Sequence, residues 1–429
     1  MSEGLLLTGG RVVDPAQELD AKRDVRITGG VIEEIGRKLP ARGARVIDVA
    51  GLVVCPGFID LRARLREPGE EEKETIETGL RAAAAGGFTA VCAMPSTQPV
   101  NDSTGHTRSL LERARAAGGA RLHPVAALSR ARAGEELTEY GDLGGAGCVA
   151  IDDDGPVPSA RLFRRALEYA SAFELPVVGG GQEASLSRDA AMHEGRVSTR
   201  LGLTGSPAAA EAIIADRDVS LAALTEGRLH IARLSTAAAA DAVRRGKARG
   251  VRVTAEVAPH YLLLSDLAVG ESAYDTATKL DPPLREEEDR IALLDALRDG
   301  TIDCLVSDHA PHHIDDKAVE FDRAAPGISS LEVAVALCLD RLVAAGEIAL
   351  SDLVGLFSTA PARIFSLPGG SLAPGSPADV TVLDLERSRT VDPAAFQSKG
   401  RVTPFAGALL KGWPVLTLVA GRSVFDSRG

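Results

Sequence analysis

The sequence predicts an α/β protein: a (β/α)8 TIM barrel with a smaller β-rich domain built from both ends of the chain. Through the middle of the 429-residue chain, apolar β-rich runs alternate with helical stretches eight times. The two ends instead contain short β-rich runs separated by turn signals. A barrel of this type takes up about 250 residues or more, so one barrel and one small domain account for the length.

The small domain comes first and last along the chain. Residues 1–55 contain the runs GLLLTGGRVVD, DVRITGGVIEEIG and ARVIDVAGLVVCPG, in which Gly-Gly pairs suggest hairpins. Residues 365–429 contain ADVTVLDLE and GWPVLTLVAGRSVFD. Neither end is long enough to bury a core alone, so we expect the two to pair into one sheet domain. Residues 56–364 then form the barrel.

The barrel strands are expected where apolar runs end in polar or glycine-rich loops. The helix after the sixth run is the clearest, with Ser235 or Thr236 as N-cap and Gly250 beyond its end. An open doubly wound sheet is the alternative, but it would show a glycine-rich phosphate turn after the first strand, and LRARLREPG is not one. The eight expected strands are 57–61, 89–94, 121–127, 147–151, 175–180, 228–234, 251–257 and 302–307.

Composition excludes several classes of partner. Apolar residues make up 45% and aromatics only 3%, so the core must consist of Ala, Val, Leu and Ile. A net charge of -12 argues against nucleic acid or an anionic membrane as the main partner. The five cysteines form no CxxC pair, which predicts reduced, buried thiols in a cytoplasmic protein. No signal peptide or membrane span is expected.

Chemistry in such a barrel lies at the carboxyl ends of the strands. The first strand ends in Arg-Ala-Arg, and the alternation of a strand points Arg62 and Arg64 to the same side. Two permanent cations aimed the same way are unusual at a strand end. The other strand-end residues are Pro95 and Ser96, Asp152 to Asp154, Gly179 to Gly181, Arg233, His260 and Asp308.

These strand ends resemble those of a known family. The motifs PGFIDL…LREPG, KETIETGLRAAAAGGFTAV, AMPSTQPVND, TAEVAPHYLLL, DPPLR, SDHAPH and SKGRVTPFAGALLKGWPVLTLVAGRSVF occur in order through the chain. In them the sequence resembles the dihydroorotases of the amidohydrolase superfamily, specifically the bacterial long-chain type. The resemblance implies a zinc metallohydrolase barrel flanked by a β-sandwich made from both termini.

Carried over residue by residue, the resemblance implies that the metal site has changed. The family's first strand ends His-x-His, and these two zinc ligands fall on Arg62 and Arg64. The histidines after the fifth and sixth strands fall on Gly180 and Arg233. The two carboxylate ligands are retained, as Asp154 and as Asp308, which in the family also shuttles a proton.

The substrate positions implied by the family are mixed. Arg66, which matches the arginine that grips the substrate carboxylate, and His312 are retained. Two asparagines are replaced by Ser96 and Asp281, and the latter places a negative charge where an anionic substrate should lie.

Zinc needs lone pairs, and these replacements offer none. Arginine is a donor only and stays protonated, glycine has no side chain, and two carboxylates alone do not make a conventional zinc site. Losing the metal would leave Asp154 and Asp308 as unpaired buried anions. We therefore predict no metal and no cofactor, and an internal salt-bridge network in which Arg62, Arg64 and Arg233 neutralise the two aspartates.

Other residues offer alternative readings. Asp308, His309, His312 and His313 in SDHAPHH form a conceivable mononuclear metal site. For the remaining histidines, we expect His230, His260 and His123 to be buried and hydrogen-bonded, and His106 and His193 to lie at the surface. The run GEEEKE at 69–74 is expected to be a solvated helix start.

Three functions from different classes remain open. The first is a non-catalytic dihydroorotase homologue, which the family resemblance links to aspartate transcarbamoylase of pyrimidine synthesis as a structural or regulatory partner. The second is an active cyclic amidohydrolase, acting on dihydroorotate or a hydantoin through an altered metal site. The third is a structural homo-oligomer unrelated to pyrimidines. We expect a homo-oligomer in the first case as well.

Overall fold

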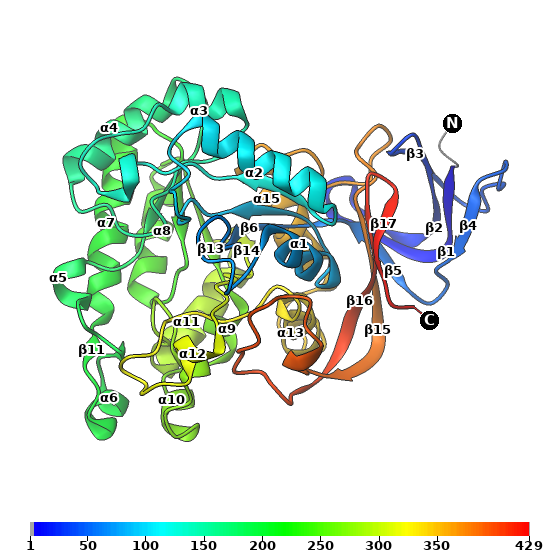
Figure 1. The fold of residues 1–429 in the computed structure, drawn as a ribbon. Coiled ribbons are helices and arrows are strands. Elements are labelled where there is room, and N and C mark those ends of the chain that lie inside the picture. Colours follow the sequence, from blue (N-terminus) through cyan, green and yellow to red (C-terminus); the bar gives the residue numbers. More distant parts are fainter. Residues whose placement is uncertain (1–3, 429) are drawn as a thin grey trace.

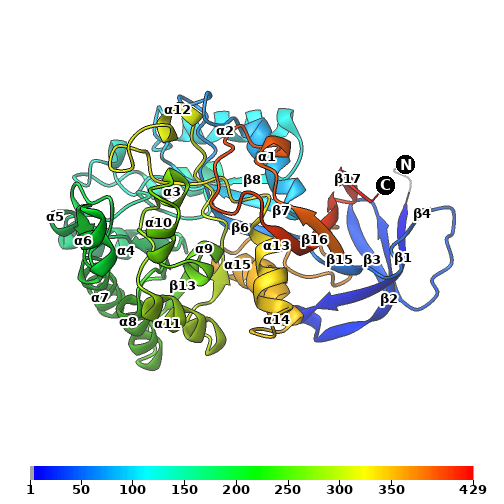
Figure 2. The same cartoon turned by 90° about the horizontal axis from the view of Figure 1, so that it is seen from below.

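A computed structural model describes residues 4–428, and residues 1–3 and 429 of the predicted small domain lie outside it. It contains a barrel and, at one side of it, a sheet that holds both the first and the last strand of the chain (Figures 1 and 2). The predicted fold class is confirmed.

The barrel is a ring made of two runs of parallel strands, which three isolated bridges join at their ends. One run pairs β6, β7 and β8, and the other pairs β9, β12, β13 and β14. Ile151 bridges Ala126 on one side and Val177 on the other, and Ala63 bridges His309, so the ring closes. The strands are β6 (Phe58–Ala63), β7 (Phe88–Ala93), β8 (Arg121–Pro124), β9 (Val177–Gly180), β12 (Leu229–Ala232), β13 (Val253–Val257) and β14 (Cys304–Leu305).

The predicted strand at 147–151 is reduced to the single bridging residue Ile151. Gly147 has φ +112° and ends the preceding helix, so the extended segment starts late. Directly after Ile151, the carboxylate of Asp152 accepts a 2.6 Å hydrogen bond from the backbone N–H of Asp154. This tight side-chain turn ends the strand early.

Helices cover the outside of the barrel. As predicted, Thr236 caps the helix after the sixth strand by accepting a hydrogen bond from the N–H of Ala239, and Gly250 follows it with φ +76°. The helices are α1 (Ile76–Ala85), α2 (Thr104–Ala117), α3 (Tyr140–Ala146), α4 (Ala160–Ser171), α5 (Ala184–Ser187), α6 (Arg196–Leu201), α7 (Ala208–Thr225), α8 (Ala237–Ala248), α9 (Pro259–Leu263), α10 (Leu267–Glu271), α11 (Glu287–Arg298), α12 (Ile314–Lys317), α13 (Ala334–Cys338), α14 (Leu350–Val354) and α15 (Ala360–Ile364). A two-stranded ribbon, β10 (Met192–His193) and β11 (Gly205–Ser206), extends the loop before α7.

The second domain is one eight-stranded sheet in the order β17-β16-β15-β5-β1-β2-β3, with β4 beside β1. Strand β5 joins the two ends of the chain, because it pairs with β1 from the first segment and with β15 from the last. The sheet has its own apolar core of Val, Leu, Ile and Ala side chains. Its strands are β1 (Leu5–Asp14), β2 (Leu19–Thr28), β3 (Val31–Gly36), β4 (Arg45–Asp48), β5 (Val53–Pro56), β15 (Val380–Thr390), β16 (Leu409–Val419) and β17 (Arg422–Asp426).

Two further sequence expectations concern the cysteines and membrane-spanning helices. All five cysteines are free and buried. Within residues 4–428, no helix has both the length and the apolar character that crossing a membrane requires.

Candidate active site

The strand ends meet at a pocket of about 370 Å³ at the barrel mouth. Arg64 and Arg66 reach it from the end of β6, Arg233 from the end of β12, and Asp308 from the segment after β14. The structure thus brings together most of the positions that the sequence singled out. The pocket is also lined by Ser96, Arg132, Asp154, Asp281 and His312.

Arg62 lies beneath this pocket, and its side chain is only 2% exposed. Its guanidinium contacts three carboxylates: Nη2 lies 2.8 Å from Asp152, Nη1 lies 3.1 Å from Asp154, and Nε lies 2.5 Å from Glu256. Burial alone would lower the pKa of Arg62, but these carboxylates raise it well above its ordinary value. Arg62 is therefore a permanent cation at the centre of an acidic shell.

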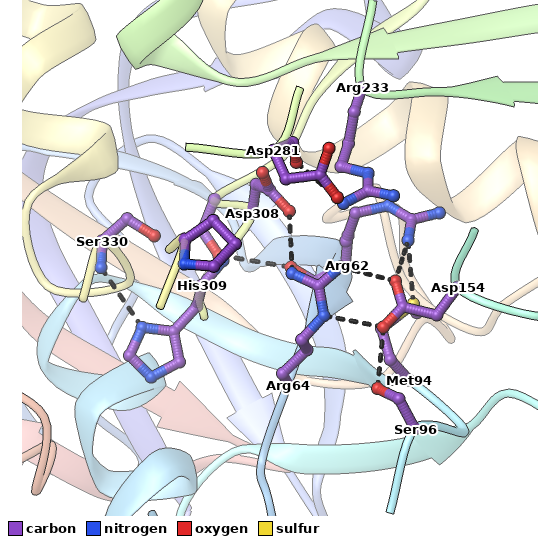
Figure 3. A network of polar contacts seen from close by, with 12 residues as sticks. Arg62, Arg64, Met94, Ser96, Asp154, Arg233, Asp281, Asp308, His309 and Ser330 are labelled. Atoms are coloured by element: carbon purple, nitrogen blue, oxygen red, sulfur yellow. Dashed lines mark hydrogen bonds and ion pairs between the residues drawn. The ribbon is translucent and has the colours of Figure 1, made fainter. Parts of the chain in front are cut away.

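Arg64 forms a two-pronged pair with Asp154 at the mouth. Its Nε and Nη2 lie 2.6 Å and 2.7 Å from the two carboxylate oxygens, and the hydroxyl of Ser96 donates to the same carboxylate at 2.7 Å. Figure 3 shows Asp154 between Arg62, Arg64 and Ser96. Because fork-on-fork pairs are the strongest arginine–carboxylate geometry, Asp154 is saturated.

The pKa values of the buried acids reflect this pairing. Burial alone would raise the pKa of Asp154, but the charges of Arg64, Arg233 and Arg62 hold it well below its usual range. Burial also opposes ionisation of Glu256, but Arg62 and a hydrogen bond with His230 lower its pKa to about 2. Both acids are therefore anions at neutral pH, as an internal ion-pair network requires.

Arg233 does not join the network as predicted. Among residues 4–428, no carboxylate oxygen lies within 4.0 Å of its guanidinium, and Nη1 instead donates to the backbone carbonyl of Asp281 at 3.0 Å. Asp308 is paired only loosely, 3.7 Å from Arg64 Nη1. Burial raises the pKa of Asp308 to about 6, although Arg233 and Arg64 partly offset this. The predicted neutralisation thus holds for Asp154 and is incomplete for Asp308.

Four of the site residues have left-handed backbone. Arg66, Asp154, Arg233 and Asp308 have φ of +62°, +50°, +52° and +48°. This conformation is uncommon for residues with a Cβ and is typical of functional sites. For Arg66 and Arg233 no sequence signal indicates it, whereas aspartate, as at Asp154 and Asp308, adopts this conformation more readily than most residues.

Gly180 ends β9 with φ +100°. A Cβ added there would lie 3.0 Å from the carbonyl oxygen of Ala232. Its N–H donates to the carboxylate of Asp218 at 3.0 Å. The backbone is therefore set for glycine, and a side chain at this position would be strained.

The substrate-type residues are engaged with their own loops. Arg66 donates from Nε to the carbonyl of Pro311 at 3.0 Å and pairs with Glu70 at 3.2 Å. Its Nη2 lies 3.2 Å from His312 Nε2. Burial and the charge of Arg66 lower the pKa of His312 to about 3, so this imidazole is neutral.

The alternative metal site in SDHAPHH does not assemble. His309 turns away from Asp308, accepting a hydrogen bond from the N–H of Ser330 at 3.2 Å and lying 3.3 Å from Glu74. The His313 side chain is 46% exposed beside Asp315. Within residues 4–428, one group of three or more potential ligands brings its ligand atoms within 4.8 Å of one another, and it lies on the strands: His230, Glu256 and Cys304. Burial raises the pKa of that thiol well above its ordinary value, and Glu256 is already bound to Arg62, so this group does not suit a cation.

Sequence reasoning missed several residues around the site. Asp152 and Glu256 were not named as partners of Arg62, although a glutamate inside the apolar run VTAEV is a visible signal. Glu74, expected to be solvated, is fully buried against His309 and Ser398. His193, expected at the surface, is buried beside Arg285. His230 is buried and hydrogen-bonded to Thr254 and Glu256, as expected. His260 is buried but its Nε2 has no hydrogen-bond partner within residues 4–428, and His123 is only partly buried, so these two expectations are wrong in part.

Comparison with known proteins places the chain in a family. Residues 51–239 match the family model described as dihydro-orotase-like. The dihydroorotase of Anaeromyxobacter dehalogenans is 51% identical over 428 residues, covering 99% of both chains. The chain belongs to the dihydroorotase family. The dihydroorotase of Desulforapulum autotrophicum is 49% identical over 97% of this chain and 98% of its own.

Solved structures agree with this dihydroorotase-family fold. The L-hydantoinase of Arthrobacter aurescens superimposes with a TM-score of 0.89 over 100% of this chain and 97% of its own, at 23% identity. A dihydropyrimidinase of Brevibacillus agri gives a TM-score of 0.85 over 99% and 95%, at 22% identity. At these identities the likeness concerns the barrel and the flanking sheet alone.

The zinc implied by the dihydroorotase family does not fit the residues present. Of the six matched positions, Arg62, Arg64 and Arg233 are cations without lone pairs, and Gly180 has no side chain. One of the two remaining carboxylates, Asp154, is held by two guanidinium groups. A divalent cation at Asp154 would have to displace both arginines, and the four matched histidine positions would offer it no ligand.

Proposed function

We propose that this dihydroorotase-family protein does not hydrolyse dihydroorotate and serves pyrimidine biosynthesis as a structural or regulatory partner of another enzyme. The observation that carries the proposal is the pairing of Asp154 with Arg62 and Arg64. The two guanidinium groups supply at this carboxylate the positive charge that a metal ion would otherwise provide.

The chemistry of the pocket supports this reading. Hydrolysis of a cyclic amide at neutral pH needs an activated water and a polarised carbonyl, and a zinc ion supplies both where it is bound. In this chain Asp308, whose pKa burial raises to about 6, can hold or release a proton, but the four matched histidine ligands of a zinc that would activate the water are replaced. A proton acceptor alone leaves the carbonyl unactivated.

The partner proposed is aspartate transcarbamoylase, which the family resemblance alone suggests. A cytoplasmic location and a homo-oligomeric state belong to the same proposal, and the five buried free cysteines agree with the first of these. Co-purification tests the partnership. The transcarbamoylase is expected to run at a larger size, with altered activity, when this chain is present. The same size and activity with and without the chain would refute the scaffold role.

A second candidate is an active cyclic amidohydrolase with an altered site. Two observations favour it: relatives at about half identity are named dihydroorotases, and Arg233, which makes no ion pair within residues 4–428, lines the pocket together with Asp308. In such an enzyme Arg233 would polarise the substrate carbonyl, and Asp308 would accept the proton of the attacking water.

Turnover decides between the two candidates. The purified chain is assayed for dihydroorotate and hydantoin hydrolysis, with and without added zinc, beside Asp308→Asn. The proposal expects rates equal to the buffer background for both proteins. Hydrolysis above background that is lost in Asp308→Asn would establish the second candidate instead.

A further inference from the structure

A second charged pocket lies away from the barrel mouth, between α6, the start of α10 and the start of α11. Its volume is about 600 Å³, and it shares no lining residue with the pocket at the barrel mouth. Figures 1 and 2 show α6 and α10 on the side of the barrel that faces away from the eight-stranded sheet. The charged residues of the lining are Arg196, Arg200, Asp266 and the three glutamates at 286–288.

Asp266 is the most buried acid of this pocket. It is 3% exposed, and its Oδ2 has no hydrogen-bond partner within residues 4–428. Burial raises the pKa of Asp266 to about 6, and the charges of Glu286 and Glu288 add to the effect. A backbone N–H and the charge of Arg200 offset this only in part. Because a buried carboxylate oxygen without a donor is costly, a donor supplied from outside would stabilise this side chain.

The charged groups of this pocket do not pair with one another. In the described part of the chain, only Glu287 among them has an oppositely charged atom within 4.0 Å, and its partner Arg290 is not part of the lining. The guanidinium of Arg200 lies against α10, because a Cβ added at Gly270 would lie 2.7 Å from its Nη2. Its charge therefore acts on Asp266 from beyond 4.0 Å, and a ligand can enter between the two.

The mixed charge of the lining restricts the ligand. Within residues 4–428 these carboxylates bring no three ligand atoms within 4.8 Å of one another, so a divalent cation does not suit the pocket. A ligand with only negative charge would meet four acids, and one with only positive charge would meet two arginines. A zwitterion suits both, because an ammonium group donates to carboxylates and a carboxylate accepts from guanidinium groups. The volume is that of a small-molecule site.

We propose that this pocket binds a small zwitterion, a free amino acid or a short peptide, with its ammonium group against Asp266 and its carboxylate toward Arg200. A ligand held there would link α6 to the start of α10. The inference goes beyond the proposed function and does not depend on it, because no residue of the barrel mouth takes part.

Glycylglycine is the probe, and its binding to the full chain is measured by titration calorimetry and by the rise in melting temperature. N-acetylglycylglycine lacks the ammonium group and glycylglycinamide lacks the carboxylate, so these two are the matched ligand controls. Glycylglycine is expected to bind and to stabilise the fold. Each control is expected to bind about tenfold more weakly, or not at all.

Asp266→Asn keeps the shape of the side chain and removes its charge, so it is expected to weaken glycylglycine binding about tenfold or more. Arg200→Gln is expected to weaken it as well. Asp216→Asn, at an exposed acid on α7 that pairs with Arg245, is expected to leave it unchanged.

Three results would each overturn the inference: no binding of glycylglycine, equal affinity of the unaltered chain for either ligand control, or equal glycylglycine affinity in Asp266→Asn and the unaltered chain. The ligand controls use the unaltered chain, so they test the inference even where a variant is unstable. Dihydroorotate turnover, which tests the proposed function, is a separate measurement.

Discussion

Replacing Arg62 with methionine tests whether a fixed cation holds the buried acids together. The substitution keeps an unbranched chain of similar bulk and removes the charge that contacts Asp152, Asp154 and Glu256 at 2.8, 3.1 and 2.5 Å. All three carboxylates are buried, so they would lose a partner that water cannot replace.

The expected cost follows from the geometry. Breaking a buried ion pair by removing one partner costs about 3–5 kcal/mol. Unfolding entropy of about 2.1 cal/mol/K per residue gives roughly 0.9 kcal/mol/K for a chain of 429 residues. Arg62→Met is therefore expected to melt roughly 3–6 °C lower than the unaltered chain at pH 7.

The pH dependence has a definite sign. The pKa of Glu256 in the fold is about 2, below that of an unfolded glutamate, so its pairing stabilises the fold above about pH 4 and is lost as the pH falls toward 2. In Arg62→Met the same buried acids would bind protons more readily. The deficit of the variant is therefore expected to be largest near pH 7 and to shrink as the pH falls to about 5.

The assay is thermal unfolding of the unaltered chain, Arg62→Met and Arg164→Met between pH 5 and 8. Arg164 is half exposed and pairs only with Glu168, so its replacement controls for loss of an arginine as such. A deficit of Arg62→Met that stays constant across this range would mean that packing, and not charge, is at stake. No deficit at all would refute the ion-pair account.

Three further predictions concern the same pocket. Asp308→Asn is expected to raise the melting temperature at pH 7 and to leave it unchanged at pH 4. Burial raises the pKa of Asp308 to about 6, so the unaltered chain loses up to about 3 kcal/mol of stability as the pH rises from about 4 to above 6, and asparagine avoids this loss. A lower melting temperature of the variant at pH 7 would contradict this. Gly180→His is expected to destabilise the chain by about 1–2 kcal/mol in thermal or urea unfolding, since its Cβ would meet the Ala232 carbonyl, and an unchanged midpoint would show that the backbone can relax. The double variant Arg62→His/Arg64→His is expected to show no dihydroorotate hydrolysis even with zinc, because Gly180 and Arg233 still offer no ligand. Turnover above background would show that these two positions do not block activity.

Much of the fold follows from local sequence patterns. Apolar runs followed by helical stretches identified the barrel, and the turn-rich ends identified the second sheet, because these features depend on residues close together in the chain. The pairing of β5 with both β1 and β15 fulfils the expectation that neither end buries a core alone. The predicted length of the fourth strand was wrong for a local reason as well, because the side-chain turn at Asp152 ends the strand early.

The site was less predictable, because its contacts join distant segments. That Arg62 and Arg64 would face Asp154 followed from the barrel, but the choice of Glu256 and Asp152 as further partners depends on side-chain reach across the barrel interior. That Arg233 donates to the backbone carbonyl of Asp281, and does not pair with an acid, was not visible from its sequence neighbours. Glu74 belongs to an acidic run that suggested solvent exposure, but it is buried and accepts hydrogen bonds from Ser398 and Lys399, far along the chain.

The most direct measurement is a crystal structure of the protein grown with excess zinc, with diffraction recorded on both sides of the zinc absorption edge. We predict no anomalous peak at the barrel mouth and the two-pronged contact between Arg64 and Asp154 in place. An anomalous peak beside Asp154 and Asp308, with the guanidinium groups of Arg62 and Arg64 swung aside, would contradict the account.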